Sequence, residues 1–554
     1  MAEHLDRHHQ QVRTSGRLWL AAGAVPPLVV LGVFFGLPVA GILARGLWPD
    51  GVFDPAGAWQ TLVRPRTARV VWFTLWSAAA GTLLSVLAGL PLAYALYRLT
   101  WPGVRVARAA LLVPFVLPTV VVGVAFRQLL RPTGPAGFLG LDGTPAGIVA
   151  ALAFFNICVV ARAVGAAWAG LDPRLGDAAA SLGATKAQVL RTVTLPMLRP
   201  AIISSASVVF LFCSTAFGVV LTMGGVRYAT VETEIYLLTT NLLDLQGAAA
   251  LSLIQIAAVI ALLGLTRRVR SHPDTGTGAA ARAPGLADLP VLAVSATVGV
   301  FLAAPVLALV TGSMRTAGGF GFDHYAALAD GSASAALPST ALQALGNTLR
   351  TALDATLMSV TMGVLIAVLV TRPSRSVAER RVRGFLDQVF MLPLGVSAVT
   401  VGFGFLITLD SPPVDLRDSP LLVPIAQALV ALPLVIRTLV PVLAAIDDTG
   451  RQAAASLGAG PVHVLRTVDL PVLVRPLVAA AGFAFAVSVG EFGATSFLAR
   501  PKTPTLPVLI FRLIGLPGQA NYGMALAASV LLAATAAGVV AIAERIHTST
   551  GALV

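Results

Sequence analysis

Few residues of this 554-residue chain carry groups that could do chemistry, and one of them stands out because of its surroundings. Glu491 is the carboxylate that we single out inside an apolar segment, residues 475–498. An acid in such a place costs about 2.5–3.5 kcal/mol on insertion scales and usually faces a cavity or a partner. Two interpretations stay open: Glu491 belongs to a gate or pathway, or it lies near the end of a span and pairs with Arg500 or Lys502.

The other groups that an enzyme would need are missing from the sequence. Cys158 and Cys213, the only cysteines, both lie in apolar segments, so neither a disulfide framework nor a CxxC metal site can form. Lys186 and Lys502, the only lysines, do not stand in a GxxxxGK[ST] phosphate-binding loop. Clusters with metal-ligand spacing and nucleophile–base pairs are also lacking. We therefore expect no catalytic residue, no metal site and no cofactor bound by the chain itself.

The composition indicates a polytopic membrane protein. Hydrophobic residues make up 56% of the chain and charged residues 11%, whereas charged residues make up about 25% of soluble chains. Mean hydropathy is +0.85. The net charge of +13 comes largely from arginines that cluster in alternate connections, which is typical of membrane topology. Nucleic acid is therefore not expected as a partner.

Apolar segments of membrane-spanning length occur twelve times. They are residues 18–43, 70–97, 109–130, 146–170, 199–223, 246–265, 289–314, 345–371, 385–409, 419–444, 475–498 and 521–543. A polar, Gly/Ala-rich linker at 266–288 separates two halves of six segments, 1–265 and 289–554. We expect an all-α polytopic protein of about 12 transmembrane helices in two parallel six-helix repeats.

A short polar connection is repeated almost unchanged in the two halves. Residues 177–196 and 452–471 are identical at 14 of 20 positions, whereas the flanking apolar segments have diverged. Both copies contain Ala-Ala-Ala-Ser-Leu-Gly-Ala and end in Leu-Pro. Each copy lies between the fourth and fifth apolar segment of its half, within the connections 171–199 and 445–475. Such a repeat predicts two equivalent loops on one face of a duplicated unit.

The residue types of this loop predict a short helix, a turn and a second helical stretch. Asp172-Pro173 is a favourable helix start, because a capping carboxylate precedes proline at the first helical position. The alanines favour helix, and Gly183 and Gly458 allow the chain to turn out of it. A flat, small surface of this kind suits docking into a groove on a partner. The alternative is an amphipathic connector that rests on lipid headgroups.

The distribution of positive charge predicts the orientation. Of the 38 Lys and Arg residues, 23 lie at the termini and in the connections near 98–108, 171–199, 266–288, 372–384 and 445–475, and 11 lie in the opposite set. The first set is therefore expected in the cytoplasm, with both termini and both repeated loops. The protein would be a multi-pass protein of the cell membrane.

The repeated loops resemble the EAA loop of ABC-importer permeases, whose pattern is Glu-Ala-Ala, a Gly three positions later, and a closing Leu-Pro. The resemblance implies the type I ABC-importer permease fold with two fused permease domains. It also implies that the loops are coupling helices, which dock into a separate ATPase subunit. The matching positions are Asp177, Ala178, Ala179, Ser181, Leu182, Gly183, Leu195 and Pro196 in the first copy, and Gln452, Ala453, Ala454, Ser456, Leu457, Gly458, Leu470 and Pro471 in the second.

One position departs from the family pattern. The initial glutamate is replaced by Asp177 in the first copy and by Gln452 in the second. Asp keeps the charge and Gln keeps only the hydrogen-bonding capacity, so the two loops could make unequal contacts. The segments 488–494 and 224–236 are also similar to those of the subfamily that imports ferric iron, thiamine or related solutes.

The resemblance therefore implies the permease subunit of an ATP-driven importer. Two copies of a cytoplasmic ATPase, with their ATP and magnesium, would bind the loops, and an extracytoplasmic binding protein would deliver a small solute such as ferric iron or thiamine. The alternative is a twelve-helix secondary transporter driven by protons or sodium. That alternative predicts ionisable residues at mid-membrane, and the sequence offers almost none apart from Glu491.

Overall fold

The protein is described by a computed structural model that covers residues 23–267, 281–316, 318–330, 339–372, 376–411, 414–416 and 419–549. Its chain forms two compact units. Unit 1 takes in the described residues of 1–45, 343–505 and 535–554, and unit 2 those of 46–342 and 506–534. Neither unit is a continuous half of the sequence. The division into halves at 1–265 and 289–554 is defined by the repeat and stays a prediction.

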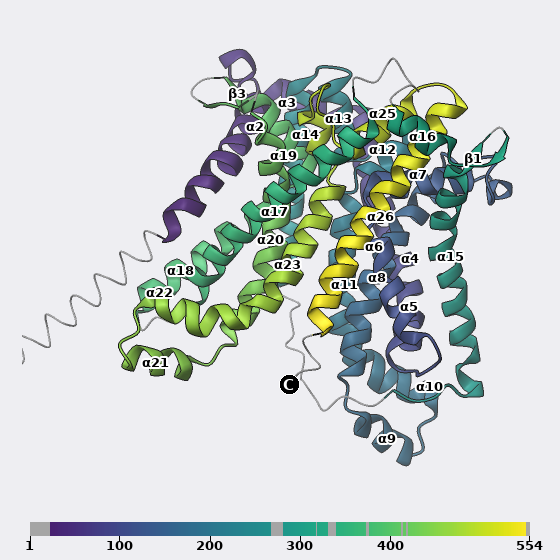
Figure 1. The fold of residues 1–554 in the computed structure, drawn as a ribbon, viewed down its shortest axis with the longest axis vertical. Coiled ribbons are helices and arrows are strands. Elements are labelled where there is room, and N and C mark those ends of the chain that lie inside the picture. The colour runs from purple at the N-terminus through teal and green to yellow at the C-terminus, as the bar shows by residue number, and fades with distance from the viewer. Residues whose placement is uncertain are drawn as a thin grey trace, which may run out of the picture. The chain divides into compact units, whose positions relative to one another are not determined.

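Unit 2 is built from long helices with short helices at both ends (Figure 1). Its elements are η2 (Pro49–Gly51), α3 (Pro55–Val63), α4 (Pro65–Tyr97), α5 (Val104–Ala110), α6 (Leu112–Val116), α7 (Thr119–Leu130), η3 (Gly137–Leu139), α8 (Pro145–Ala169), α9 (Pro173–Ser181), α10 (Lys186–Val189), η4 (Leu190–Thr194), α11 (Leu195–Ser214), α12 (Gly218–Gly224), α13 (Val231–Thr240), α14 (Leu245–Arg267), η5 (Leu286–Asp288), α15 (Leu289–Ser313), β1 (Arg315–Thr316), β2 (Gly319–Phe320), α16 (Asp323–Asp330) and α25 (Leu506–Gly515). In Figure 1, α9 and α10 stand at one end of this unit and α16 and α25 at the other.

Unit 1 repeats this plan. It contains η1 (Gly32–Gly36), α2 (Leu37–Leu47), α17 (Ala341–Thr371), α18 (Val377–Phe390), η6 (Leu392–Gly395), α19 (Ala398–Thr408), β3 (Asp410–Ser411), β4 (Val414–Asp415), α20 (Leu422–Ala444), α21 (Asp448–Ser456), α22 (Pro461–Val464), η7 (Leu465–Asp469), α23 (Leu470–Gly490) and α24 (Thr495–Leu498). The last helix, α26 (Gln519–Ser549), contributes its second part to unit 1 and its first part to unit 2. Helices α21 and α22 stand at one end of unit 1, and β3 stands at the other (Figure 1).

The all-α polytopic architecture is confirmed, with fewer straight spans than the sequence suggested. Within the described residues, ten helices are long and apolar enough to cross a membrane, or eleven if one bent pair counts as a span. The segments expected to cross at 109–130 and 385–409 are not single helices. Those at 199–223 and 475–498 are also interrupted, after Ser214 and after Gly490.

A proline explains the sharpest of these interruptions. The helices Val104–Val116 and Thr119–Leu130 are bent by 102° at Leu117-Pro118. Leu117 has an extended backbone, with φ −63° and ψ 129°, because the ring of Pro118 disfavours the α conformation in the residue before it. The expected third span of the second half is interrupted at Met391, and η6 follows with Pro393 near its start.

Small residues let the main helices of each unit approach closely. A Cβ atom on Gly89 of α4 would lie 2.8 Å from the side chain of Val160 on α8. In the second copy, a Cβ atom on Gly363 of α17 would lie 2.5 Å from Val435 on α20. Both distances are too short for a real side chain, so only glycine fits. The same helix crossing is therefore preserved at equivalent positions of the repeat.

The structure describes the two ends of the expected linker at 266–288. Helix α14 continues to Arg267, and residues 268–280 lie outside the described residues. Beyond them the backbone of Arg282 exchanges two hydrogen bonds with the end of α4, to the carbonyl of Arg98 at 3.1 Å and from the amide of Thr100 at 2.8 Å. The Arg282 guanidinium pairs with Asp288 at 2.7 Å. The end of the linker is therefore fixed to unit 2.

Candidate functional site

The first Ala-rich loop folds as a capped helix followed by a left-handed turn. The carboxylate of Asp172 accepts a hydrogen bond from the Arg174 amide at 2.9 Å, which caps α9 at its start. Gly183 follows α9 with φ +88°. The Gly183 amide donates to the carbonyl of Ala180 at 2.9 Å, and the Ala184 amide donates to that of Ala179 at 3.1 Å. These two bonds form a Schellman motif, which needs a residue free to adopt positive φ.

The second loop has the same construction. Asp447 stands one residue before α21 and accepts hydrogen bonds from the hydroxyl of Thr449 at 2.7 Å and from its amide at 3.2 Å. These bonds stabilise the ionised carboxylate and so lower the pKa of Asp447 below its ordinary value. Gly458 has φ +84°, and the Ala459 amide donates to the carbonyl of Ala454 at 3.0 Å. The helix and turn expected from the sequence are thus present in both copies.

Each loop presents an exposed leucine at its tip. The side chain of Leu182 is 89% exposed and that of Leu457 is 88% exposed. Large apolar side chains held in water by a rigid turn are typical of a surface that a partner covers. Exposed with them are Asp177, Ala178, Ser181, Gly183, Pro196, Gln452, Ala453, Ser456, Gly458, Leu470 and Pro471, whereas Ala179, Leu195 and Ala454 are half-buried.

Both loops continue into the fifth span of their half without a break in the helix. In each copy a π-helical turn, η4 or η7, joins the short helix to α11 or α23. The Leu195 amide bonds the carbonyl of Leu190, and the Leu470 amide bonds that of Leu465. Pro196 and Pro471 follow closely after these π-helical turns, and neither residue has an amide hydrogen to donate to the preceding turn. A force on the loop is therefore carried directly into a membrane-spanning helix.

A buried ion cluster holds the second loop to its unit. Asp469, at the end of η7, is 1% exposed. Its carboxylate accepts from Arg451 of α21 at 2.7 Å and from Arg372, which follows α17, at 3.0 Å. Arg451 also pairs with Asp448 at 3.0 Å and donates to the Leu443 carbonyl at 3.3 Å. Sequence reasoning missed this cluster, although the arginines and the aspartate stand in polar connections.

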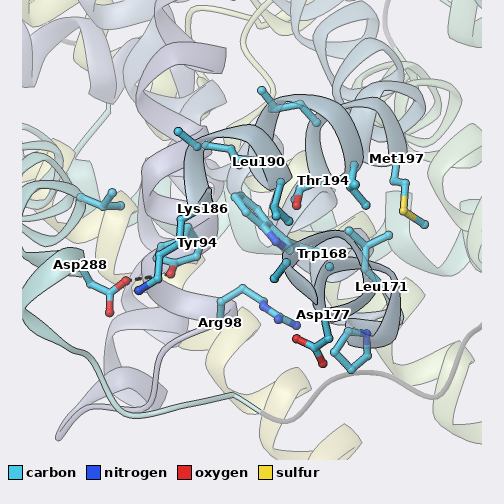
Figure 2. Close-up of a pocket in the computed structure, with 18 of the residues that line it drawn as sticks. Tyr94, Arg98, Trp168, Leu171, Asp177, Lys186, Leu190, Thr194, Met197 and Asp288 are labelled. Atoms are coloured by element: carbon cyan, nitrogen blue, oxygen red, sulfur yellow. Dashed lines mark hydrogen bonds between the residues drawn. The ribbon is translucent and has the colours of Figure 1, made fainter. Parts of the chain in front are cut away.

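The first loop has a cavity instead of an ion cluster at this place. The positions that match Arg451 and Asp469 carry Gly176 and Thr194, and Arg98 stands in the place of Arg372. A cavity of about 750 Å³ opens there between α4, the end of α8, α9, α10 and η5 (Figure 2). The two copies therefore share a surface and differ in what supports it.

Glu491 lies at a helix break and is almost fully buried. It follows the last residue of α23, and its carboxylate accepts hydrogen bonds from the amides of Ala494 and Thr495, at 2.7 and 3.0 Å, and from the Thr495 hydroxyl. Through these contacts the Glu491 side chain caps the start of α24. Sequence reasoning missed this capping role. A role of Glu491 in a gate or pathway stays a prediction.

The acidic residues near α13 are more buried than their sequence context suggests. Glu232 is 0% exposed and receives a hydrogen bond from Gln255, and Glu234 is 3% exposed and forms a two-bond ion pair with Arg66 at 2.5 and 2.9 Å. Both carboxylates are therefore held inside the protein by partners from other helices. Across the described residues, no three His, Cys, Asp or Glu side chains converge as metal ligands would.

Comparison with known proteins finds one family and several relatives. The family described as "Binding-protein-dependent transport system inner membrane component" matches residues 359–549. The chain is 26% identical to the thiamine transport system permease protein ThiP of Brucella abortus, with 90% of this chain and 92% of the relative covered. Identity is 27% to ThiP of Escherichia coli, with 90% and 91% covered. The molybdenum transport system permease protein ModB of Mycobacterium tuberculosis is 32% identical, and the match covers 45% of this chain and 95% of ModB.

The ion cluster under the second loop makes a prediction about stability. The substitution Asp469→Asn should lower the free energy of unfolding by about 3 kcal/mol, because it leaves Arg451 and Arg372 without their shared carboxylate. Thermal unfolding of the purified protein in detergent measures the change. Thr194→Asn, at the matching position of the first copy, is the control and should change the unfolding temperature much less. Equal shifts in the two variants would contradict the cluster's role.

Proposed function

This chain belongs to the family of binding-protein-dependent transport system inner membrane components, and from that premise we propose that its two Ala-rich loops dock two copies of a cytoplasmic ATPase. As a member of this family, the chain is a multi-pass inner-membrane permease and not itself an enzyme. ATP hydrolysis belongs to a separate subunit, and an ATPase and a binding protein are the partners that such permeases have in general.

One observation carries the docking proposal: Leu182 and Leu457 are both exposed at the equivalent position of the two loops. The two leucines stand at the same position of two capped helices, after the same alanines and before a glycine with nearly the same positive φ. Lipid contact alone does not require such a rigid turn, whereas a protein groove requires a fixed position for each contact. The exposure of both leucines therefore supports two identical partner grooves, one for each loop.

Docking would act on the pathway through the helices that follow the loops. Because η4 runs into α11 and η7 into α23 as continuous helix, a displacement of a docked loop would move the fifth span of its half. In this proposal ATP binding draws the two loops together and ATP hydrolysis releases them. The excess of arginine in the connections of the loop side supports a cytoplasmic location for both loops and both termini.

For the solute, we favour a thiamine-like compound over ferric iron. The relatives that match about nine tenths of this chain are thiamine permeases, and the molybdenum permease matches less than half of it. This preference rests on similarity of 26–27% identity alone, and ferric iron is the alternative that the test below must exclude. An extracytoplasmic binding protein would deliver the solute to the permease.

The docking proposal predicts that charge at the two tips abolishes the complex. In Leu182→Asp plus Leu457→Asp, a carboxylate at each tip would have to enter an apolar groove, so binding of the cognate ATPase should fall by at least about a hundredfold. Both side chains are exposed, so the permease itself should fold and insert normally. Co-purification and titration with the ATPase measure the effect.

The matched control is Leu242→Asp, which changes an exposed leucine in the connection between α13 and α14. It should leave ATPase binding unchanged. Undiminished binding in the double-loop variant would refute docking through these tips.

The solute proposal is tested by uptake into vesicles that hold the permease, its ATPase and its binding protein. With ATP inside, thiamine should accumulate, and a tenfold excess of ferric iron or molybdate should not compete. If ferric iron accumulates and thiamine does not, the preference for a thiamine-like solute is wrong while the permease function stands. Uptake that persists without the ATPase would instead favour a secondary transporter.

A further inference from the structure

The cavity beneath the first loop is lined by charged and apolar groups from segments far apart in the sequence. Arg98 at the end of α4, Lys186 of α10 and Asp177 of α9 contribute charge. Trp168 of α8 and Val291 of α15 are among the apolar residues of its wall. Figure 2 shows Arg98 and Asp177 extending toward one another from opposite sides of the cavity. All of these residues belong to unit 2, so the cavity lies within one compact unit.

A neighbouring pair of charges at the cavity edge is already neutralised. The Arg282 guanidinium donates two hydrogen bonds to Asp288, at 2.7 and 2.8 Å, and the Tyr94 hydroxyl donates to the same carboxylate at 2.8 Å. The carboxylate of Asp172 is used to cap α9. These groups therefore add little attraction for a charged ligand.

Arg98 and Lys186, in contrast, are not neutralised by a neighbouring carboxylate of the described residues. Among the described residues neither side chain forms an ion pair. The Nη1 atom of Arg98 is enclosed by protein and has no hydrogen-bond partner, and other atoms of this half-buried side chain line the cavity. A buried guanidinium nitrogen without an acceptor is costly, about 1–3 kcal/mol or more for a charged group. Asp177 does not remove this cost, because its exposed side chain forms no ion pair with Arg98 either.

The second copy shows which charge the first copy lacks. There the arginine that matches Arg98 is Arg372, and it meets the buried carboxylate of Asp469 at 3.0 Å. In the first copy Thr194 stands in the place of Asp469 and provides no charge. The first copy thus has the arginine without an internal anion, and a cavity of about 750 Å³ lies in this place.

We propose that the cavity binds a phosphate-bearing anion, which takes the place of Asp469 and lies between Arg98 and Lys186. A phosphate group offers several oxygen acceptors, and guanidinium groups bind it through paired hydrogen bonds. The bound anion would connect the end of α4 to α10 through Arg98 and Lys186, whereas the ion cluster of the second copy connects the end of α17 to α21 and η7. The first loop is then supported by a bound anion, whereas the second loop is supported by the carboxylate of Asp469.

The phosphate can come from a phospholipid headgroup or from a soluble phosphate compound. The apolar part of the wall, which includes Trp168, Val291 and Leu90, is suited to the glycerol and acyl portion of a lipid. Basic pockets beside membrane-spanning helices bind anionic headgroups in this way. Separate probes distinguish the two sources.

Calorimetric titration of the purified full-length permease tests the proposal. The probes are dioctanoyl phosphatidylglycerol, inorganic phosphate and, as the lipid without net charge, dioctanoyl phosphatidylcholine. Dioctanoyl phosphatidylglycerol should bind at one saturable site in the wild type, and Arg98→Gln should weaken it about tenfold. Thr194→Asp, which supplies the carboxylate of the second copy, should weaken it at least as much.

The matched control is Arg105→Gln, which removes an exposed arginine of α5 that does not line the cavity. Its affinity should remain within twofold of the wild type. Binding of phosphatidylglycerol alone identifies a lipid source, and equal binding of inorganic phosphate identifies a soluble source; both results support the anion site. The proposal is overturned if neither anion binds more tightly than phosphatidylcholine does. It is also overturned if Arg98→Gln and Thr194→Asp bind as the wild type does.

Discussion

A charge buried among apolar helices has to meet an opposite charge or a set of hydrogen-bond donors, and this constraint governs the described parts of the molecule. Asp469 meets two arginines, Glu234 meets Arg66, and Glu491 accepts three hydrogen bonds from the start of α24. In each case the partner comes from another segment or from a helix end, so the charge fixes a junction between segments. These three buried carboxylates therefore stabilise junctions between segments.

The two Ala-rich loops show how duplication can preserve a surface and change its support. The exposed face is the same in both copies, with a capped helix, a left-handed glycine and an exposed leucine. The base of each loop faces its own unit and is free to diverge. Internal ion pairs support the second loop, and a cavity lies beneath the first. If the proposed anion binds, it would supply to the first loop a charge that the second loop has within its own chain.

The sequence predicted the helical class, most spans and the conformation of the repeated loops, because these depend on local signals such as apolar length, capping residues and glycine. Sequence reasoning failed where a residue's partner lies far away in the chain. It also failed where a helix is apolar on all sides, because periodicity then gives no signal of a break. The bend at Leu117-Pro118 was signalled by the proline alone, inside an otherwise uninterrupted apolar segment. The burial of Glu232 depends on packing of α13 against α14, and the capping by Glu491 on a break that composition does not reveal.

If the proposed function is right, the ATPase covers both repeated loops in the working complex. Hydrogen exchange of backbone amides, followed by mass spectrometry on the permease with and without its cognate ATPase, tests this most directly. We expect slower exchange in both loops, 171–199 and 445–475, on complex formation, with no change in the connection around residues 240–246. Formation of the complex with unchanged exchange in either loop would contradict it.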